Sequence, residues 1–277
     1  TAVMYAFPLL FILVVLGLPV FGSELSLQGN IEQGALILGK VAPGTHISVN
    51  GRRVHVDDTG VFLFGLGRDH PQTLILEARF TDGSTVRQEK MVQQRQYEEQ
   101  YIDGLPDKLV TPPIELRDRI SREASDVLKA RSHLTLIPHV QDGLIWPVKG
   151  PITGVYGSRR ILNGKPRTPH YGIDIAAPPG TPVKAMSNGI IRLASELYLS
   201  GKTIIIDHGH GISSSYLHMQ SIAVETNDEI GRGHVIGRVG ETGRTTGPHL
   251  DWRINWFDIR LDPQLVERLL GLESNKH

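Results

Sequence analysis

The sequence predicts a mainly β protein, with an N-terminal β-sandwich of the immunoglobulin-like kind, a linking helix and a C-terminal compact antiparallel β domain. Three observations favour this class. Short apolar or alternating runs recur at regular spacing, turn signals separate them, and few segments have helical periodicity. The 277 residues include 30 Gly and 17 Pro, which fits a chain rich in strands and turns.

Charge and cysteine content narrow the class of function. The chain carries 29 Lys and Arg against 29 Asp and Glu, so its net charge gives no reason to expect a nucleic-acid partner. It has no Cys, which excludes disulfide frameworks, thiol nucleophiles and metal sites built on thiolates. The 12 His are therefore the main candidates for metal binding and proton transfer in the chain.

Residues 1–22 are predicted to be a signal peptide. An uncharged apolar run extends from Tyr5 to Phe21, and a polar stretch follows it at once. The run is short for a membrane span, and Gly17 and Pro19 weaken its far end. The alternative is an uncleaved N-terminal anchor, and a membrane is an expected partner only in that case. Both interpretations place the rest of the chain outside the cytoplasm.

Residues 24–92 are predicted to form the β-sandwich. Asn50-Gly51, between two of the candidate strands, is a hairpin signal. No cluster of acids or histidines with the spacing of a catalytic site occurs here, so we expect a spacer or a binding module. The strands are expected at Ala35–Leu38, Thr45–Val49, Val54–Val56, Val61–Leu66, Thr73–Phe80 and Ser84–Val92.

Residues 93–134 are predicted to be a connector that contains one amphipathic helix. Thr111 is the expected N-cap residue, with Pro112 in the first helical position. Apolar residues then recur on one helical face as far as about Ser132, which predicts that the helix packs on one of the two domains.

Residues 135–277 are predicted to form the compact β domain. Glycine-rich turns again separate short strand patterns, and a short closing helix follows Pro263. The clearest strands are expected at Pro182–Ala185, Gly189–Ala194, Lys202–Asp207, Ile212–Leu217 and His249–Ile254, and the helix at Leu265–Leu272.

Histidines and aspartates gather in this last domain. His170 and Asp174 are four residues apart and His249 and Asp251 are two apart, so on an extended strand each pair can point to one face. Imidazole and carboxylate groups are a normal ligand set for a divalent metal such as zinc. His218 lies between the two pairs in the sequence. Chance supplies such spacings easily, so spacing alone is a weak signal.

Three motifs in order carry a specific resemblance. HYGIDIAAPPGTPVKA, DHGHGISSSYLHM and GHVIGRVGETGRTTGPHLDWRI together resemble the lysostaphin/LytM-type zinc metallopeptidases over about Trp146 to Pro263. The resemblance implies an exported endopeptidase that hydrolyses peptide cross-links of bacterial peptidoglycan, with the stem peptides as its substrate. It also implies a periplasmic location in a Gram-negative bacterium and one Zn²⁺ per chain. In that setting, a cell-wall protein is the expected partner of residues 24–92.

The resemblance assigns roles to five residues. His170 and Asp174 correspond to two metal ligands of the family, and Asp251 stands where the family has its third ligand, a histidine. His218 and His249 correspond to the two histidines that serve hydrolysis.

Asp251 changes the charge expected at such a centre. Two carboxylates would cancel the charge of a divalent ion, whereas the usual ligand set leaves one positive charge. A less positive centre should acidify its water less and favour harder metals such as Mn²⁺ somewhat more, so another divalent metal is an alternative to zinc. The alternative function is a catalytically inactive protein that binds and activates another cell-wall hydrolase.

Two further residues are candidates for binding substrate. Tyr156 and Arg160 are predicted to line the cleft, where they would meet carboxylates of the substrate. Simple placement on the surface is the alternative for both.

Overall fold

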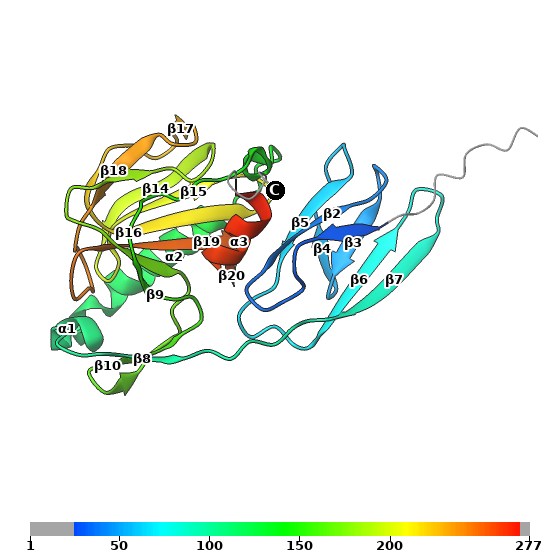
Figure 1. Cartoon of the computed structure of the whole chain (residues 1–277). Coiled ribbons are helices and arrows are strands. Elements are labelled where there is room, and N and C mark those ends of the chain that lie inside the picture. Colours follow the sequence, from blue (N-terminus) through cyan, green and yellow to red (C-terminus); the bar gives the residue numbers. More distant parts are fainter. Residues whose placement is uncertain (1–24, 272–277) are drawn as a thin grey trace, which may run out of the picture.

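The computed structural model describes residues 25–271, so the predicted signal peptide at residues 1–22 lies outside the described part of the chain. The described part is mainly β, with antiparallel pairing dominant and few helices, as the sequence predicts. Within it, no helix has the length and hydropathy needed to span a membrane. Figure 1 shows two lobes, with an extended segment running between them along one side.

The first lobe contains two antiparallel sheets, with strand orders β1-β2-β5 and β4-β3-β6-β7. Leu74, Leu76 and Ala78 alternate with more exposed residues along one strand, and they share a hydrophobic core with Phe62 and Phe64 of the other sheet. This arrangement fits the predicted sandwich, while its immunoglobulin-like character stays a prediction. The strands are β1 (Ser26–Gln28), β2 (Leu36–Lys40), β3 (His46–Val49), β4 (Arg52–Val54), β5 (Val61–Gly65), β6 (Thr73–Arg79) and β7 (Thr85–Met91).

The connector contains a strand that the sequence did not predict. This strand, β8 (Glu99–Ile102), pairs in parallel with β10 (Arg159–Leu162) of the second lobe, and β10 pairs in turn with β11 (Lys165–Pro166). The connector is therefore bound to the second lobe through backbone hydrogen bonds over this stretch.

The predicted helix exists, but it begins later than Thr111. A short helix, α1 (Asp107–Val110), ends at Thr111, and a 3₁₀ turn, η1 (Ile114–Leu116), precedes the main helix α2 (Arg117–Arg131). Pro112 cannot open the helix readily, because the proline that follows it disfavours the helical conformation in the residue before.

The second lobe is built on a ten-stranded sheet, whose main path is β17-β14-β15-β16-β19-β12-β9. β18 pairs with β13 and β16, and β20 pairs with β19. The bounds are β9 (Ile152–Gly154), β12 (Ile173–Ala176), β13 (Pro182–Lys184), β14 (Gly189–Leu197), β15 (Gly201–Asp207), β16 (Ile212–Ile222), β17 (Glu229–Ile230), β18 (Val235–Val239), β19 (His249–Trp256) and β20 (Ile259–Leu261), with a 3₁₀ turn η2 (His139–Asp142) before them.

The helix α2 lies on one face of this sheet. Val127 and Ala130 of the helix pack against Leu193 and Leu197 of β14 and Ile205 of β15. Burying these side chains holds the connector helix on β14 and β15.

The closing helix α3 (Pro263–Leu270) lies where the two lobes meet (Figure 1). Its N-cap residue Asp262 accepts a hydrogen bond from the backbone N–H of Gln264 at 3.0 Å. The same carboxylate accepts a bond from Arg95 of the connector at 2.8 Å, and its backbone N–H donates to Gly34 of the first lobe at 2.8 Å. One buried aspartate therefore links all three parts of the chain.

Candidate metal centre

Two neighbouring strands bring the predicted carboxylate ligands together. β12 and β19 pair in antiparallel fashion, with Asp174 directly opposite Asp251 and Ala176 opposite His249. Opposite residues in such a pair share a face, as do residues two apart on one strand, so Asp174, Asp251 and His249 project from the same face. Gly154 of β9 leaves the necessary room, because a Cβ there would lie 2.3 Å from Oδ2 of Asp174.

His170 reaches the same point from the loop before β12. Its backbone N–H donates to Ser158 O at 2.9 Å, and its carbonyl accepts from the N–H of Gly157 at 2.7 Å. Its Nε2 lies 3.0 Å from Oδ1 of Asp174. Within residues 25–271, neither ring nitrogen of His170 nor that oxygen finds a partner in hydrogen-bond geometry, although all three atoms are buried.

These atoms fit a divalent cation. One ligand atom each from His170, Asp174 and Asp251 lies within 4.8 Å of the others. Buried polar atoms ordinarily have partners, so unpaired ones that converge on one point indicate a missing ligand, and imidazole and carboxylate are groups that zinc accepts.

Two arginines are paired with the carboxylates. Arg160 was expected to meet carboxylates of the substrate, and its pairing with Asp174 was not predicted, nor was that of Arg253 with Asp251. Arg253 donates through Nε to Oδ1 of Asp251 at 2.8 Å and through Nη2 to Oδ2 at 2.5 Å. Arg160 donates to Oδ2 of Asp174. Each carboxylate oxygen can accept more than one bond, so acceptor positions remain for a metal. However, the prediction that two carboxylates would cancel the charge of a divalent ion did not include these two guanidinium groups. Their positive charges make the centre more positive than predicted and weaken its attraction for a dication.

Both carboxyl groups are ionised at neutral pH. Burial acts to raise the pKa of Asp251, but Arg253 together with His170 and His218 outweighs burial and holds this pKa far below its ordinary value. Burial likewise acts to raise the pKa of Asp174, while His170 and Arg160 hold it below its ordinary value. The charged form, which is the form that binds metals, is therefore the stable one.

His218 lies at a bulge in β16. Leu217 and His218 together stand opposite the single residue Thr203 of β15, and the backbone φ of His218 is +63°. Non-glycine residues rarely adopt this conformation, and they gather at functional sites. The His218 ring lies beside that of His249, with the ring centroids 5.0 Å apart.

Backbone carbonyls fix the tautomers of both rings. Nδ1 of His218 lies 2.7 Å from Thr242 O, and Nδ1 of His249 lies 2.8 Å from Gly247 O. A carbonyl can only accept, so Nδ1 carries the proton in each ring and Nε2 is left unprotonated in the neutral form. Burial lowers the pKa of His218 to about 4, which keeps that ring neutral at pH 7.

Two cavities flank these side chains, and the connector supplies a wall to each. The larger, of about 510 Å³, lies beside α2 and is lined by His218 and Asp251. The smaller, of about 150 Å³, is lined by Asp174 and His249, and by Gln100 of β8. Arg160 lines both cavities, so the structure places this predicted substrate residue at the centre, against Asp174.

Tyr156 occupies a different environment from the one predicted. It is only 2% exposed, its hydroxyl donates to Arg260 O at 2.8 Å, and its ring packs edge-on against Tyr97 with centroids 6.3 Å apart. A side chain enclosed in this way has no free surface for a ligand, so the predicted role in substrate binding is wrong for Tyr156. Its burial beneath the contact between the lobes is instead a packing role.

A second histidine pair, His208 and His210, is occupied with structural contacts. His208 is 0% exposed, its Nδ1 lies 2.6 Å from Asn188 O, and its Nε2 lies 2.7 Å from the hydroxyl of Ser214. His210 bonds through Nε2 to Leu136 O at 2.9 Å. Neither belongs to the group of potential metal ligands found in residues 25–271.

His208 gives a prediction for the pH dependence of stability. Burial lowers its pKa in the folded protein to about 4, whereas the unfolded value is about 6.5. As the pH falls below about 6.5, the unfolded chain takes up this proton before the folded protein does, so stability is lost between about pH 6.5 and 4. Urea unfolding should show a loss of about 2 kcal/mol from this residue between pH 7 and 5. The His208→Gln protein should lack that component, and an identical pH slope in both proteins would contradict the assignment.

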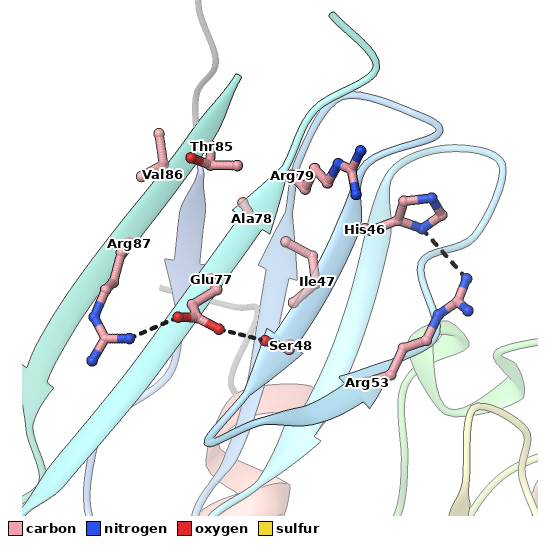
Figure 2. A pocket seen from close by; sticks show the side chains of 10 residues that line it. All are labelled: His46, Ile47, Ser48, Arg53, Glu77, Ala78, Arg79, Thr85, Val86 and Arg87. Atoms are coloured by element: carbon pink, nitrogen blue, oxygen red, sulfur yellow. Dashed lines mark hydrogen bonds and ion pairs between the residues drawn. The ribbon is translucent and has the colours of Figure 1, made fainter. Parts of the chain in front are cut away.

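A hollow of about 640 Å³ on the β4-β3-β6-β7 sheet of the first lobe has no comparable chemistry (Figure 2). The carboxylate of Glu77 accepts bonds from Arg87 at 2.7 Å and from Ser48 at 3.2 Å, so its charge is already matched. Of the residues that the structure describes, none here joins a group of three potential metal ligands. The candidate chemistry therefore lies in the second lobe.

Comparison with known proteins identifies the second lobe. The model of peptidase family M23 matches residues 168–263. The peptidoglycan DD-endopeptidase ShyC of Vibrio cholerae is 37% identical over 98 residues, which is 35% of this chain and 23% of ShyC. The murein hydrolase activator EnvC of Escherichia coli is 36% identical over 121 residues, which is 44% of this chain and 27% of EnvC. The chain thus matches about a quarter of the length of these relatives.

A solved structure resembles both lobes together. The crystal structure of a candidate M23 peptidase from Pseudomonas aeruginosa has a TM-score of 0.66 and 27% sequence identity, over 86% of this chain and 95% of that one. Residues 168–263 therefore form a domain of peptidase family M23, of the lysostaphin/LytM type.

Proposed function

We propose that this chain is an exported, metal-dependent endopeptidase that hydrolyses peptide cross-links of bacterial peptidoglycan in a Gram-negative periplasm. The main support is the convergence of His170, Asp174 and Asp251 within 4.8 Å, on the sheet face that also carries His249. The similarity to ShyC, whose name describes a peptidoglycan DD-endopeptidase, favours stem peptides as the substrate.

In this proposal three residues bind the metal and the two remaining histidines transfer protons. His170, Asp174 and Asp251 would hold Zn²⁺ or another divalent ion, which when bound supplies an acidified water and polarises the scissile carbonyl. His249, held by Gly247 O, presents an unprotonated Nε2 that can take the proton of the attacking water.

His218 is better suited to relay a proton than to bind an oxyanion. Its Nδ1–H is committed to Thr242 O, so Nε2 carries no hydrogen to donate in the neutral ring. Its place beside His249 lets the two rings share a proton on the way to the leaving amine.

The pairing of Asp251 with Arg253 favours one alternative, an inactive protein that binds and activates another wall hydrolase. Both oxygens of Asp251 already accept bonds from this arginine, which competes with a metal for the same carboxylate. The similarity to EnvC, whose name describes a murein hydrolase activator, points the same way.

One experiment separates the two functions. The purified full chain is analysed for bound metal and then incubated with purified peptidoglycan, with a chelated sample as control. Bound zinc or manganese together with released peptides that vanish on chelation supports the peptidase. A protein that holds no divalent metal after zinc is supplied, and that releases no product, overturns the proposal in favour of the activator.

Substitution of Asp251 tests its role as the third ligand. Asp251→Asn keeps the shape but removes the charge, and we expect zinc binding to weaken by about 10-fold or more. Asp251→His restores the usual ligand and should retain zinc at least as tightly as the parent. Competition with a coloured chelator measures both affinities. Equal affinity in the parent and the Asn protein would exclude Asp251 as a ligand.

A further inference from the structure

The larger cavity is lined by two chemically different groups of side chains. Its apolar wall consists of Ile120 and Val127 of α2, Leu197 of β14 and Leu217 of β16. Arginines from several elements, α2 included, also line it, so the cavity combines apolar surface with strongly basic groups. A ligand that fits must therefore have an aliphatic part and an anionic part.

Five arginines line this cavity: Arg131, Arg160, Arg244, Arg253 and Arg260. Two of them, Arg160 and Arg253, are paired with aspartates of the candidate centre. Across residues 25–271 the other three form no ion pair, and each donates only to a neutral acceptor, although Arg260 also lies over the Tyr171 ring, 5.7 Å from its centroid. The neutral acceptors are the hydroxyl of Ser215 for Arg131 at 3.2 Å, the carbonyl of Leu109 for Arg244 at 3.4 Å and the side-chain oxygen of Asn255 for Arg260 at 3.3 Å.

The carboxylates that line the cavity are already engaged. Asp251 is held by Arg253 at 2.5 and 2.8 Å, and Glu123 accepts a bond from Arg119 at 2.7 Å. The second oxygen of Glu123 accepts from the backbone N–H of Tyr198 at 2.8 Å. Asp251 therefore acts on the three unpaired arginines only from a distance, and among the described side chains none gives them an ion-pair contact.

The excess of positive charge is energetically unfavourable for Arg131 in particular, because this side chain is buried. It is only 7% exposed, and its Nε is buried without a hydrogen-bond partner within residues 25–271. Desolvation, together with the positive charges of Arg260 and Arg253, lowers the pKa of Arg131 well below its ordinary value. Burial and Arg253 likewise lower the pKa of Arg260 to about 10. A buried guanidinium is ordinarily paired, so the cavity lacks the group that would balance it.

We propose that this cavity binds the free carboxylate of a peptide that ends in a small aliphatic residue, with Arg131 and Arg260 holding the carboxylate and the apolar wall holding the side chain. Guanidinium groups match carboxylate geometry with paired hydrogen bonds. Inorganic phosphate would satisfy the charge but would leave the apolar wall unused. The choice of a peptide rests on the proposed function, whereas the charge imbalance does not.

Calorimetric titration of metal-free full-length protein with N-acetylalanine tests the site. The metal is removed first, so that no bound ion can hold the carboxylate, and the outcome is independent of hydrolysis. We expect saturable binding of N-acetylalanine, no binding of N-acetylalanine amide, and weak or no binding of inorganic phosphate. Equal heats for the acid and the amide, binding of phosphate alone, or no binding of the acid would each overturn the proposal.

Variants of the cavity arginines test whether N-acetylalanine binds in this cavity. Arg131→Gln should weaken N-acetylalanine binding by about tenfold or more, since it removes a charge-assisted pair. Arg122→Gln, on the exposed side of the same helix, should bind as the parent does. Without ligand, Arg131→Gln should melt no lower than the parent, because it removes a buried unpaired charge. Arg260→Gln, on β20, provides the same test from another element, and undiminished binding by both the Arg131 and Arg260 variants would refute the proposal.

Discussion

Replacing His249 with Ala is expected to lower the rate of peptidoglycan hydrolysis by about 10²–10⁴-fold, while the protein keeps its metal. The reason is geometric: its Nδ1 is held by Gly247 O, and its free Nε2 lies 3.6 Å from Oδ1 of Asp174, beside the proposed ligands. The removed group is thus the proposed proton acceptor, whereas His170, Asp174 and Asp251 remain. Release of soluble peptides from purified peptidoglycan measures the rate, and elemental analysis measures the metal.

A matched control tests whether replacing any exposed histidine lowers the rate of hydrolysis. His234 is exposed and lies outside the candidate centre, so His234→Ala should hydrolyse at the rate of the parent. Loss of metal from the His249→Ala protein would instead make His249 a ligand, and full activity would remove it from the mechanism.

Replacing His170 with Ala is expected to abolish both metal binding and hydrolysis. His170 supplies the single imidazole of the proposed ligand set, and the two carboxylates that remain are each bonded to an arginine. In the parent, saturating zinc should raise the melting temperature, because a ligand held at 100 times its dissociation constant stabilises a fold by about 3 kcal/mol. In the His170→Ala protein the melting temperature should not respond to zinc.

The pair of variants is more informative than either alone. His170→Ala and His249→Ala should both lose hydrolysis, but only the first should lose the metal. A His170→Ala protein with the zinc content and the zinc-dependent melting shift of the parent would exclude His170 as a ligand, whatever its activity.

Local patterns predicted the strands of the first lobe closely. The strand expected at Val61–Leu66 is observed at Val61–Gly65, and the one expected at Thr73–Phe80 is observed at Thr73–Arg79. The first is a continuous apolar run and the second alternates in burial, and each has a nearby turn signal, so the information lies within a few residues of sequence. The short strand β1 was not predicted.

β8 could not be predicted in the same way. Its residues Glu99–Ile102 are mostly polar, and their extended conformation depends on pairing with Arg159–Leu162, about 60 residues later. The start of α2 was mistaken for a different, local reason. The prediction treated Thr111 and Pro112 as a cap, without weighing the restriction that the second proline places on the first.

The sequence indicated which residues gather at the candidate centre, but it did not indicate the arginines that pair with its carboxylates. The spacing of His249 and Asp251 indicated a shared face, but only the register of β12 and β19 shows that Asp174 stands opposite Asp251. Arg253 lies two residues beyond Asp251 on the same strand, so the same period of two could have found it. Arg131 follows Val127 by four residues in α2, and helical periodicity could have placed it on the buried face.

The parallel pairing of β8 with β10 also orders events during folding. Glu99 is synthesised long before its partner Arg159, and closing so long a loop costs chain entropy before the pairing contributes anything. We therefore expect β8 to pair only after Arg159–Leu162 has been synthesised, so the wall that Gln100 gives to the smaller cavity should form late. A fragment that begins at residue 135 would keep the proposed ligands but would lack the connector side chains that line both cavities. We therefore expect this fragment to bind and hydrolyse the proposed substrate differently from the whole chain.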